Sequence, residues 1–113
     1  MNCLFCNIAN KQLPASIVYE DDEIIAFHDI TPQAPTHIVI IPRQHIATLN
    51  DLNAQTVALA GRLLLRVPLI AKEQGVSETG YRTVINCNAS GGQTVFHLHV
   101  HLLAGRLLTW PPG

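Results

Sequence analysis

Three histidines occur at every second position near the C-terminus, in the segment T-V-F-H-L-H-V-H-L-L at residues 94 to 103. The residues between and around His97, His99 and His101 are branched or aromatic and favour a strand, in which alternate side chains share one face. At a rise of roughly 3.3 Å per residue, neighbouring histidines lie about 6.6 Å apart and the outer two about 13 Å apart. One pair can therefore hold a metal ion, but the full row cannot share one.

The loop directly before these histidines reads S-G-G-Q-T, residues 90 to 94. Paired glycines let the backbone approach an anion and turn its N–H groups toward it, and Gln93 and Thr94 add side-chain donors. A G-G pair on its own usually marks a tight turn. Its position beside the histidine row favours a phosphate-binding loop.

Two kinds of chemistry fit the histidine row. A neutral imidazole can attack phosphorus, and the resulting P–N bond breaks readily because the leaving imidazole has a pKa of about 6.5. A neighbouring imidazole of similar pKa can supply a proton at neutral pH. The H-x-H spacing is also common in structural and catalytic metal sites. The spacing alone supports phosphoryl or nucleotidyl transfer and metal binding equally.

Size and charge narrow the classes of function. The chain has 113 residues, a formal net charge of -1 and no block of like charge. We expect one domain over residues 1–113, without the electrostatic footprint of a nucleic-acid-binding protein. The N-terminus lacks the features of a signal peptide, and no uninterrupted apolar run approaches a membrane span. A soluble cytoplasmic protein that binds neither nucleic acid nor membrane is therefore expected.

The three cysteines are an odd number. The Cys3-x-x-Cys6 spacing is more natural for a metal or redox pair than for a structural disulfide in a reducing compartment. Cys87 stands apart from this pair and is interpreted as a free thiol.

Apolar periodicity predicts strands, one long helix and further strands. The helix runs from about 53 to 74, where Asn53 can cap its start and Gly75 can end it. The strands are expected at residues 17–20, 23–28, 37–41, 81–86 and 95–103. This order indicates one α+β domain with a mostly antiparallel sheet.

The expected helix is apolar around almost its whole circumference, so it must be buried on two sides. Its polar wedge is narrow and consists of Arg62, Arg66 and Glu73. The core stripe consists of Val57, Ala60, Leu63, Leu64, Val67, Ile70 and Ala71, whereas Leu59, Leu65 and Leu69 face elsewhere. One sheet covers one side only, and we therefore expect a homodimer with this helix in the interface.

Residues 86 to 103, N-C-N-A-S-G-G-Q-T-V-F-H-L-H-V-H-L-L, resemble the signature of the histidine-triad (HIT) family of nucleotide hydrolases and transferases. Further similarity covers V-Y-E-D-D at 18 to 22, F-H-D-I-T-P-Q-A-P-T-H at 27 to 37, G-Y-R at 80 to 82 and G-R-L-L-T-W-P-P-G at 105 to 113. The chain most resembles the Hint branch, the purine nucleoside phosphoramidases. The resemblance implies a HIT-like α+β fold: a mostly antiparallel five-stranded sheet, one long helix, a short N-terminal helix, and sheets joined across a homodimer.

The resemblance also implies an activity. The substrates would be adenosine or guanosine 5′-phosphoramidates of the AMP-lysine or AMP-amine type, hydrolysed at the P–N bond through a nucleotidyl-histidine intermediate without a catalytic cofactor. Of the four histidines in the catalytic centre, His99 would be the nucleophile, His101 would contact the phosphate and leaving group, His37 would complete a proton relay, and His97 would anchor the motif. The alternatives are a dinucleoside polyphosphate hydrolase or nucleotidyl transferase of the same superfamily, and a nucleotide- or zinc-binding interaction module with little catalysis.

Further positions match the family's nucleotide-binding residues. Asp29 would bind the ribose hydroxyls, although an Asp before Ile30-Thr31-Pro32 also suits a turn. Trp110 belongs to a tail that approaches the partner's site in relatives. The phosphate would contact Asn86, Gly92, Gln93 and Thr94, and the base would lie in an apolar slot of Phe5, Ile8, Phe27, Ile30 and Val39. Asn88 stands where relatives often have glycine and tolerates a positive φ.

The resemblance finally extends to a metal site. Cys3, Cys6, His45 and His97 match the four ligands of zinc-carrying histidine-triad proteins. Two thiolates and two imidazoles suit a closed tetrahedral zinc site, which is structural because no position stays open for substrate. His97 would then have a task different from that of His99 and His101.

Overall fold

The computed structural model describes residues 2–113 of the chain. The strands form one sheet in the order β1-β2-β3-β5-β4, and every neighbouring pair is antiparallel. The expected fold of a five-stranded antiparallel sheet with one long helix and a short N-terminal helix is confirmed. The main elements are α1 (Leu4–Ala9), β1 (Ile17–Glu20), β2 (Ile24–His28), β3 (Thr36–Pro42), α2 (Val57–Glu73), β4 (Tyr81–Val84) and β5 (Val100–Ala104).

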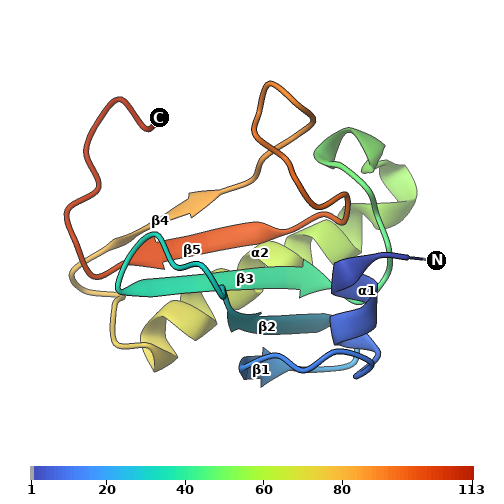
Figure 1. Cartoon of the computed structure of the whole chain (residues 1–113), viewed down its shortest axis with the longest axis horizontal. Helices are drawn as coiled ribbons and strands as arrows, with labels where there is room; N and C mark the ends of the chain where they lie inside the picture. Colours follow the sequence, from blue (N-terminus) through green and yellow to red (C-terminus); the bar gives the residue numbers. More distant parts are fainter. Residues whose placement is uncertain (1) are drawn as a thin grey trace.

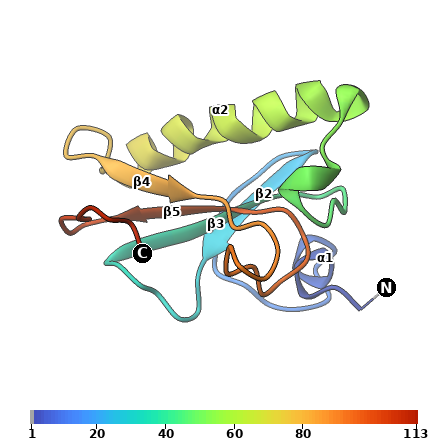
Figure 2. The same ribbon diagram turned by 90° about the horizontal axis from the view of Figure 1, so that it is seen from above.

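The sheet separates two apolar cores. Helix α2 covers one face, and α1 lies against the other (Figures 1 and 2). Leu98, Val100 and Leu102 belong to the core on the α2 side. Because neighbouring residues of an extended chain point to opposite faces, the histidines between them point to the α1 side. There the rings of His97 and His99 both contact Phe5, so the expectation that the histidines share one face is confirmed.

The strand expected at residues 95–103 begins only at Val100, and this part of the prediction is wrong. The pairing of Ile40 with Val100 is the last in the ladder between β3 and β5, and β3 ends at Pro42. Before Val100, the Leu98 N–H donates to the Ile46 carbonyl at 2.6 Å. The chain therefore stays extended without a strand ladder, and His97 and His99 precede β5. The strand expected at 81–86 is also shorter and ends at Val84.

The start of the expected helix is a 3-10 turn, Ala54–Thr56, and the α-helix proper begins at Val57. Asn53 caps this turn, because its side-chain oxygen accepts the Gln55 N–H at 2.9 Å. Gly75, with a φ of +73°, follows the C-terminal end as expected.

Helix α2 packs one side on the sheet. Leu59, Leu63, Val67 and Ile70 form the buried stripe. Val57 and Leu64, which the periodicity assigned to the core, are exposed, and Leu59 is buried instead. The reason is geometric: Leu64 lies one residue, or about 100°, further round the helix than Leu63.

Charged residues fix the helix to the turn between β1 and β2. Arg66 Nε donates to Asp21 Oδ2 at 2.8 Å, and Arg62 Nε lies 2.6 Å from Glu23 Oε1. The Asp21 carboxylate also accepts the N–H groups of Glu23 and Ile24, each at 2.8 Å. The polar wedge therefore sets how α2 lies over the sheet, and thereby supports the strands that carry the histidines.

The outer side of α2 carries Leu64, Leu65 and Leu69, which are exposed in the single chain. By length and composition, Ala54–Glu73 is also apolar enough to cross a membrane. The segment is not an uninterrupted apolar run, because Arg62 and Arg66 lie within it, so the expectation from the sequence is not contradicted. The helices that pack on a sheet in globular proteins pass the same test, and the inner side of α2 packs in this way.

Candidate functional site

His99 is held with one ring nitrogen free to react. Its side chain is buried, with its ring centroid 5.0 Å from that of Phe5. His99 Nδ1 lies 2.7 Å from the His97 carbonyl oxygen, and since a carbonyl can only accept, Nδ1 carries the proton. Nε2 of the neutral ring is therefore unprotonated. Burial lowers the pKa of His99, which favours the neutral, nucleophilic form near pH 7.

His37 of β3 and His101 of β5 form a hydrogen-bonded pair. The Gln33 N–H donates to His37 Nδ1 at 3.0 Å, so neutral His37 carries its proton on Nε2. His37 Nε2 lies 2.9 Å from His101 Nδ1 and donates to it. Neutral His101 in turn carries its proton on Nε2. One backbone amide thus sets the tautomers of both rings.

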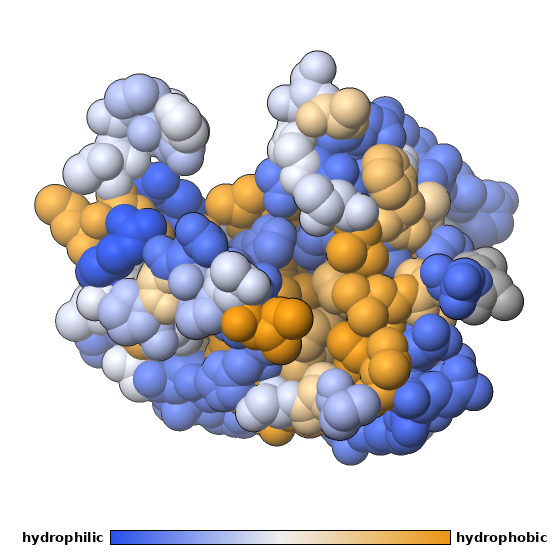
Figure 3. Space-filling view, viewed as in Figure 1, coloured by the Kyte–Doolittle hydropathy of each residue, from blue (hydrophilic) through white to orange (hydrophobic). Residues whose placement is uncertain are grey.

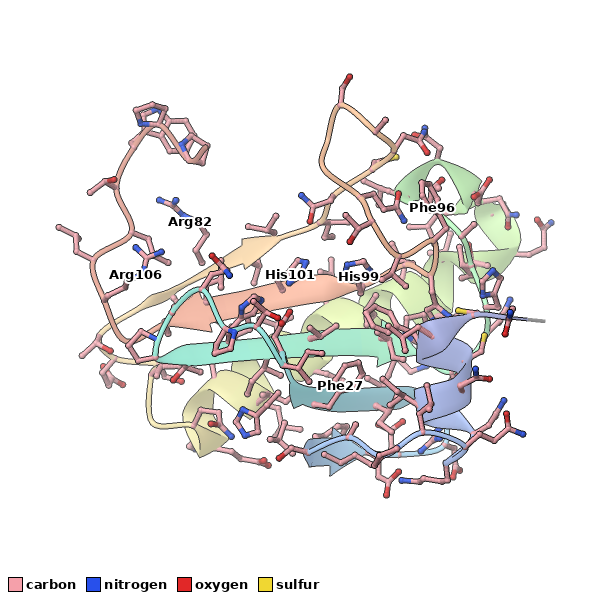
Figure 4. All side chains as sticks on the ribbon, in the orientation of Figure 1. Phe27, Arg82, Phe96, His99, His101 and Arg106 are labelled. Atoms are coloured by element: carbon pink, nitrogen blue, oxygen red, sulfur yellow. The ribbon has the colours of Figure 1, made fainter. Side chains whose placement is uncertain are left out.

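Burial favours the neutral form of both rings in this pair. Burial lowers the pKa of His37, although the Asp29 carboxylate opposes this change from 3.5 Å. Burial and the neighbouring His99 and His37 lower the pKa of His101 to about 4. The His99 and His101 rings lie side by side, with centroids 4.9 Å apart (Figure 4). An unprotonated ring nitrogen of His99 therefore lies beside a ring that carries a proton on Nε2.

Asp29 lies in the loop after β2. Its Oδ1 accepts the Thr31 N–H at 2.8 Å, so the turn considered from the sequence is present. The carboxylate keeps further lone pairs for a ligand with two hydroxyl donors. His28, beside it, is exposed on the surface.

The glycine-rich loop before the histidines is tightly built. A Cβ at Gly91 would lie 2.5 Å from the Cys87 carbonyl oxygen, so only glycine fits there. Gly92 has a φ of +80°, and Asn88 has the expected positive φ, +60°. Asn86 Nδ2 donates to the Gly91 carbonyl at 2.6 Å. Thr94 is exposed and free to meet a ligand.

Gln93 does not fit the role assigned to it. Its side-chain N–H groups donate to the carbonyls of Ala47 and Val95, at 2.8 and 3.1 Å. Its Oε1 accepts the Asn88 N–H at 2.8 Å. The side chain is buried and fully used inside the protein, so it fastens the loop and offers no donor to phosphate.

The apolar slot is assembled only in part. Phe5, Ile8, Phe27 and Val39 are buried in one cluster, on the side of the sheet that carries the histidines. Apolar surface continues across this face of the molecule (Figure 3). Ile30 is 97% exposed, and Trp110 is 81% exposed in a tail that leaves the far end of β5. Within one chain, Trp110 is therefore not brought to the histidines.

The four expected metal ligands do converge. Cys3 Sγ and Cys6 Sγ lie 3.4 and 3.5 Å from His97 Nδ1, and His45 Nδ1 lies 3.3 Å from both Cys6 Sγ and His97 Nδ1. Tetrahedral zinc with Zn–S of about 2.3 Å and Zn–N of about 2.0 Å needs separations of roughly 3.3 Å between two nitrogens and roughly 3.5 Å between a sulfur and a nitrogen. His97 Nε2 donates to the Pro42 carbonyl at 2.7 Å, which leaves Nδ1 free to ligate. The donor set therefore fits a structural zinc ion.

A second group of metal-type residues, Asp29, His37 and His101, also converges. A metal on His37 Nε2 would require the proton to sit on Nδ1, where the Gln33 N–H already donates. The hydrogen bonding of this group therefore suits the transfer of protons and not the binding of a metal ion. Sequence reasoning missed the Gln33 amide and the Pro42 carbonyl, because backbone groups carry no residue-type signal.

Comparisons with known proteins give one consistent result. The sequence profile of the HIT domain matches residues 10–108. The chain is 48% identical to the purine nucleoside phosphoramidase of Escherichia coli over 105 residues, 93% of this chain and 88% of that protein. It is 46% identical to a 14 kDa zinc-binding protein of Brassica juncea, covering 97% and 98%. A crystal structure of a HIT family hydrolase from Legionella pneumophila matches with a TM-score of 0.97 and 55% identity, over 99% of this chain and 100% of that one.

Proposed function

This chain belongs to the HIT domain family, and we propose that it is a purine nucleoside phosphoramidase acting through a nucleotidyl-His99 intermediate. The similarity to the E. coli phosphoramidase over most of both chains supports the substrate class. The observation that carries the mechanism is the hydrogen bond from His99 Nδ1 to the His97 carbonyl at 2.7 Å. It leaves Nε2 unprotonated beside a second imidazole, as an attacking nitrogen requires.

In the first step, His99 Nε2 attacks phosphorus and the P–N bond to the leaving amine breaks. The amine needs a proton, which His101 Nε2 donates. His101 Nδ1 then takes the proton of His37 Nε2, 2.9 Å away. For this transfer His37 must begin as an imidazolium, with its second proton on Nδ1. The negative charge of bound substrate and the Asp29 carboxylate, 3.5 Å from His37, favour that form.

In the second step, water attacks phosphorus and releases His99. The water gives its proton to His101 Nε2, and His101 Nδ1 returns a proton to His37 Nε2. His37 becomes an imidazolium again, so the protons balance over the cycle. The net reaction converts a nucleoside phosphoramidate and water into a nucleoside monophosphate and an amine.

The nucleotide is proposed to lie across the α1 face. Asp29 would accept the two ribose hydroxyls, and the base would lie against Phe5, Ile8, Phe27 and Val39, with Ile30 as an exposed wall. The phosphate would meet Asn86, Gly92 and Thr94 beside His99. The side chain of Gln93 is left out, since its polar atoms are bonded inside the loop.

We assign Cys3, Cys6, His45 and His97 to a structural zinc ion. The ion would cross-link α1, the segment after β3 and the histidine segment, and its four protein ligands would leave no position for substrate. The similarity to the B. juncea zinc-binding protein supports this assignment. No catalytic step is assigned to the metal.

The exposed leucines of α2 and the open edge of β4 support a homodimer. A second copy would cover both and extend the sheet, and its tail would bring Trp110 toward the site. Light scattering is expected to give about twice the monomer mass of 12.4 kDa. A fully active monomer would contradict this assembly.

The central test is turnover of an adenosine 5′-phosphoramidate with an amine leaving group. We expect the parent to release AMP with and without chelator, and His99→Ala to lose at least about 10³-fold in kcat, because the nucleophile is gone. His28→Ala is the matched control: it removes an exposed histidine of β2 outside the site and should keep parental kcat. Because the P–N bond to an imidazole is labile in acid and stable in base, quenching in alkaline detergent with labelled substrate should trap AMP on the parent and not on His99→Ala.

Three results would contradict the proposal. Turnover that survives His99→Ala would overturn the covalent mechanism. Faster release of AMP from a diadenosine polyphosphate than from the phosphoramidate would overturn the substrate class. Nucleotide binding without turnover of either compound would make the protein an interaction module.

A further inference from the structure

The loop between β2 and β3 is held on both sides of one residue, Gln33. Its N–H donates to His37 Nδ1 at 3.0 Å. Its carbonyl accepts from Arg106 Nε at 3.2 Å and from Arg106 Nη2 at 3.0 Å. A residue at the start of the C-terminal tail therefore reaches His37 through a single intervening residue.

The tail is closely packed where this contact occurs. Gly105 has a φ of +94°, and a Cβ there would lie 2.7 Å from Pro35 Cβ. Within residues 2–113, no carboxylate lies within ion-pair distance of Arg106. The guanidinium is thus devoted to backbone carbonyls. Figure 4 shows Arg106 near Arg82, beside the tail.

Arg82 offers a natural comparison. Its Nη2 donates to the carbonyls of Leu108 and Thr109, both at 2.9 Å. Both arginines line a cavity of about 540 Å³ under the tail. Both fasten backbone carbonyls with a guanidinium, but only Arg106 bonds to the loop that contacts His37.

We propose that Arg106 is a positioning residue that sets the proton affinity of His37 by holding Gln33 in place. The Gln33 N–H requires a lone pair on His37 Nδ1, so a proton can occupy Nδ1 only when this amide turns away. The Arg106–Gln33–His37 contact, called the latch below, therefore keeps His37 and His101 neutral in the absence of substrate. Its catalytic consequence rests on the proposed function, in which His37 must become an imidazolium.

The other groups that face His37 stay in place when Arg106 is changed. They are the Asp29 carboxylate, 3.5 Å away in the loop, and His101 of β5, 2.9 Å away, with His99 beyond it. A change in the pKa of His37 in an Arg106 variant therefore measures the loss of the hydrogen bond from the Gln33 N–H.

The test is a pH titration of His37 by ¹⁵N NMR in full-length, histidine-labelled protein. We expect Arg106→Ala to raise the pKa of His37 by roughly half to one unit, the size expected for loss of one hydrogen bond to the neutral ring. The resting proton should also shift partly from Nε2 to Nδ1. Arg106→Lys, which keeps one cationic donor, should fall between parent and Arg106→Ala.

Arg82→Ala is the matched control, because it loosens the same tail without touching Gln33. It should leave the His37 titration of the parent unchanged. The pH at which kcat is half-maximal should move in Arg106→Ala by the same shift as the NMR titration, with KM changed less than about twofold.

Parental titration of His37 in Arg106→Ala would overturn the latch, and so would an equal shift in Arg82→Ala. The NMR measurement needs no turnover. A shifted titration in a protein without phosphoramidase activity would therefore keep the latch and reject the proposed function.

Discussion

Two histidine clusters lie on the same face of the sheet: the Cys3, Cys6, His45 and His97 cluster, and the His37 and His101 pair. They differ in the backbone group that is hydrogen-bonded to one ring nitrogen and so decides what the other nitrogen can do. His97 donates through Nε2 to the Pro42 carbonyl, so its inner nitrogen, Nδ1, turns a lone pair toward two sulfurs and His45. His37 instead accepts the Gln33 N–H at Nδ1, so its inner nitrogen carries a proton toward His101. A carbonyl that accepts from one ring nitrogen leaves a lone pair on the other, as in His97 and also in His99, whereas an amide that donates to one nitrogen leaves a proton on the other, as in His37.

This difference explains how one short motif supports two kinds of chemistry. Alternation along the chain places His97, His99 and His101 on one face and settles nothing further. Each ring then meets a different backbone group, and that group decides which nitrogen is free. In the proposed function, the metal and nucleotide interpretations, equal on spacing alone, apply to different members of the same row.

The largest expected effect concerns the Cys3, Cys6, His45 and His97 cluster. Removing zinc with a chelator should lower the free energy of unfolding by about 4 kcal/mol, the value for a ligand at 1,000 times its Kd. For a domain of this size that is a fall in Tm of about 15 °C. Cys6→Ala should show the same low Tm and bind no zinc, as measured by metal analysis and thermal melting.

The third cysteine provides the control for this experiment. Cys87 is free and lies outside the cluster, so Cys87→Ala should keep one zinc per chain and the parental Tm. If the parent protein binds no zinc, or if its Tm is the same with and without chelator, the first cluster is not a zinc site and the distinction between the two clusters is wrong.

The second effect concerns the His37 and His101 pair. His101→Asn removes the proton donor next to His99, and kcat should fall about 10²-fold, at the low end for loss of a general acid. Zinc content and Tm should stay near the parental values, because no metal ligand is touched. Steady-state kinetics with metal analysis on the same samples checks this prediction. A kcat within threefold of the parent would mean that the pair is not a relay.

The sequence predicts residue types and faces better than it predicts backbone partners. The fold class, Asn53 as a cap and the convergence of Cys3, Cys6, His45 and His97 all depend on side-chain type and spacing, and the structure agrees with them. The early start of the last strand was wrong because β3 ends at Pro42 and leaves residues 95–99 without a strand to pair with. Gln93 was misassigned because an amide side chain suits phosphate and backbone carbonyls equally well.

The tautomers could not be read from the sequence for the same reason. The Gln33 N–H and the carbonyls of Pro42 and His97 are groups that almost every residue possesses, and only the folded chain brings them to the rings. The apolar character of α2 was foreseen, and Leu63, Val67, Ile70 and Ala71 are buried as expected. Val57 and Leu64 were wrongly included and Leu59 was left out, because the helix is apolar on most sides.

The smallest expected effect is on how the stability of the protein depends on pH through His37 and His101. Burial lowers the pKa of His101 from its usual value to about 4, and the pKa of His37 is also lowered. Between about pH 6.5 and 4 the unfolded chain therefore binds a proton at His101 that the native state does not. Stability is fully present above pH 6.5 and falls as the pH drops, with a slope of at most about 1.4 kcal/mol per pH unit for each histidine.

His101→Asn removes one such group and should flatten this slope. The comparison of parent and variant, both saturated with zinc, cancels the contribution of the metal cluster. The groups facing His101 are His99, His37 and Asp29, and all of them remain in the variant. Denaturant unfolding at pH 7.0, 6.0 and 5.0 measures the difference. Parallel curves for parent and variant would mean that His101 titrates normally in the folded protein, and the pair would then lack the buried, neutral state that distinguishes it from an ordinary pair of surface histidines.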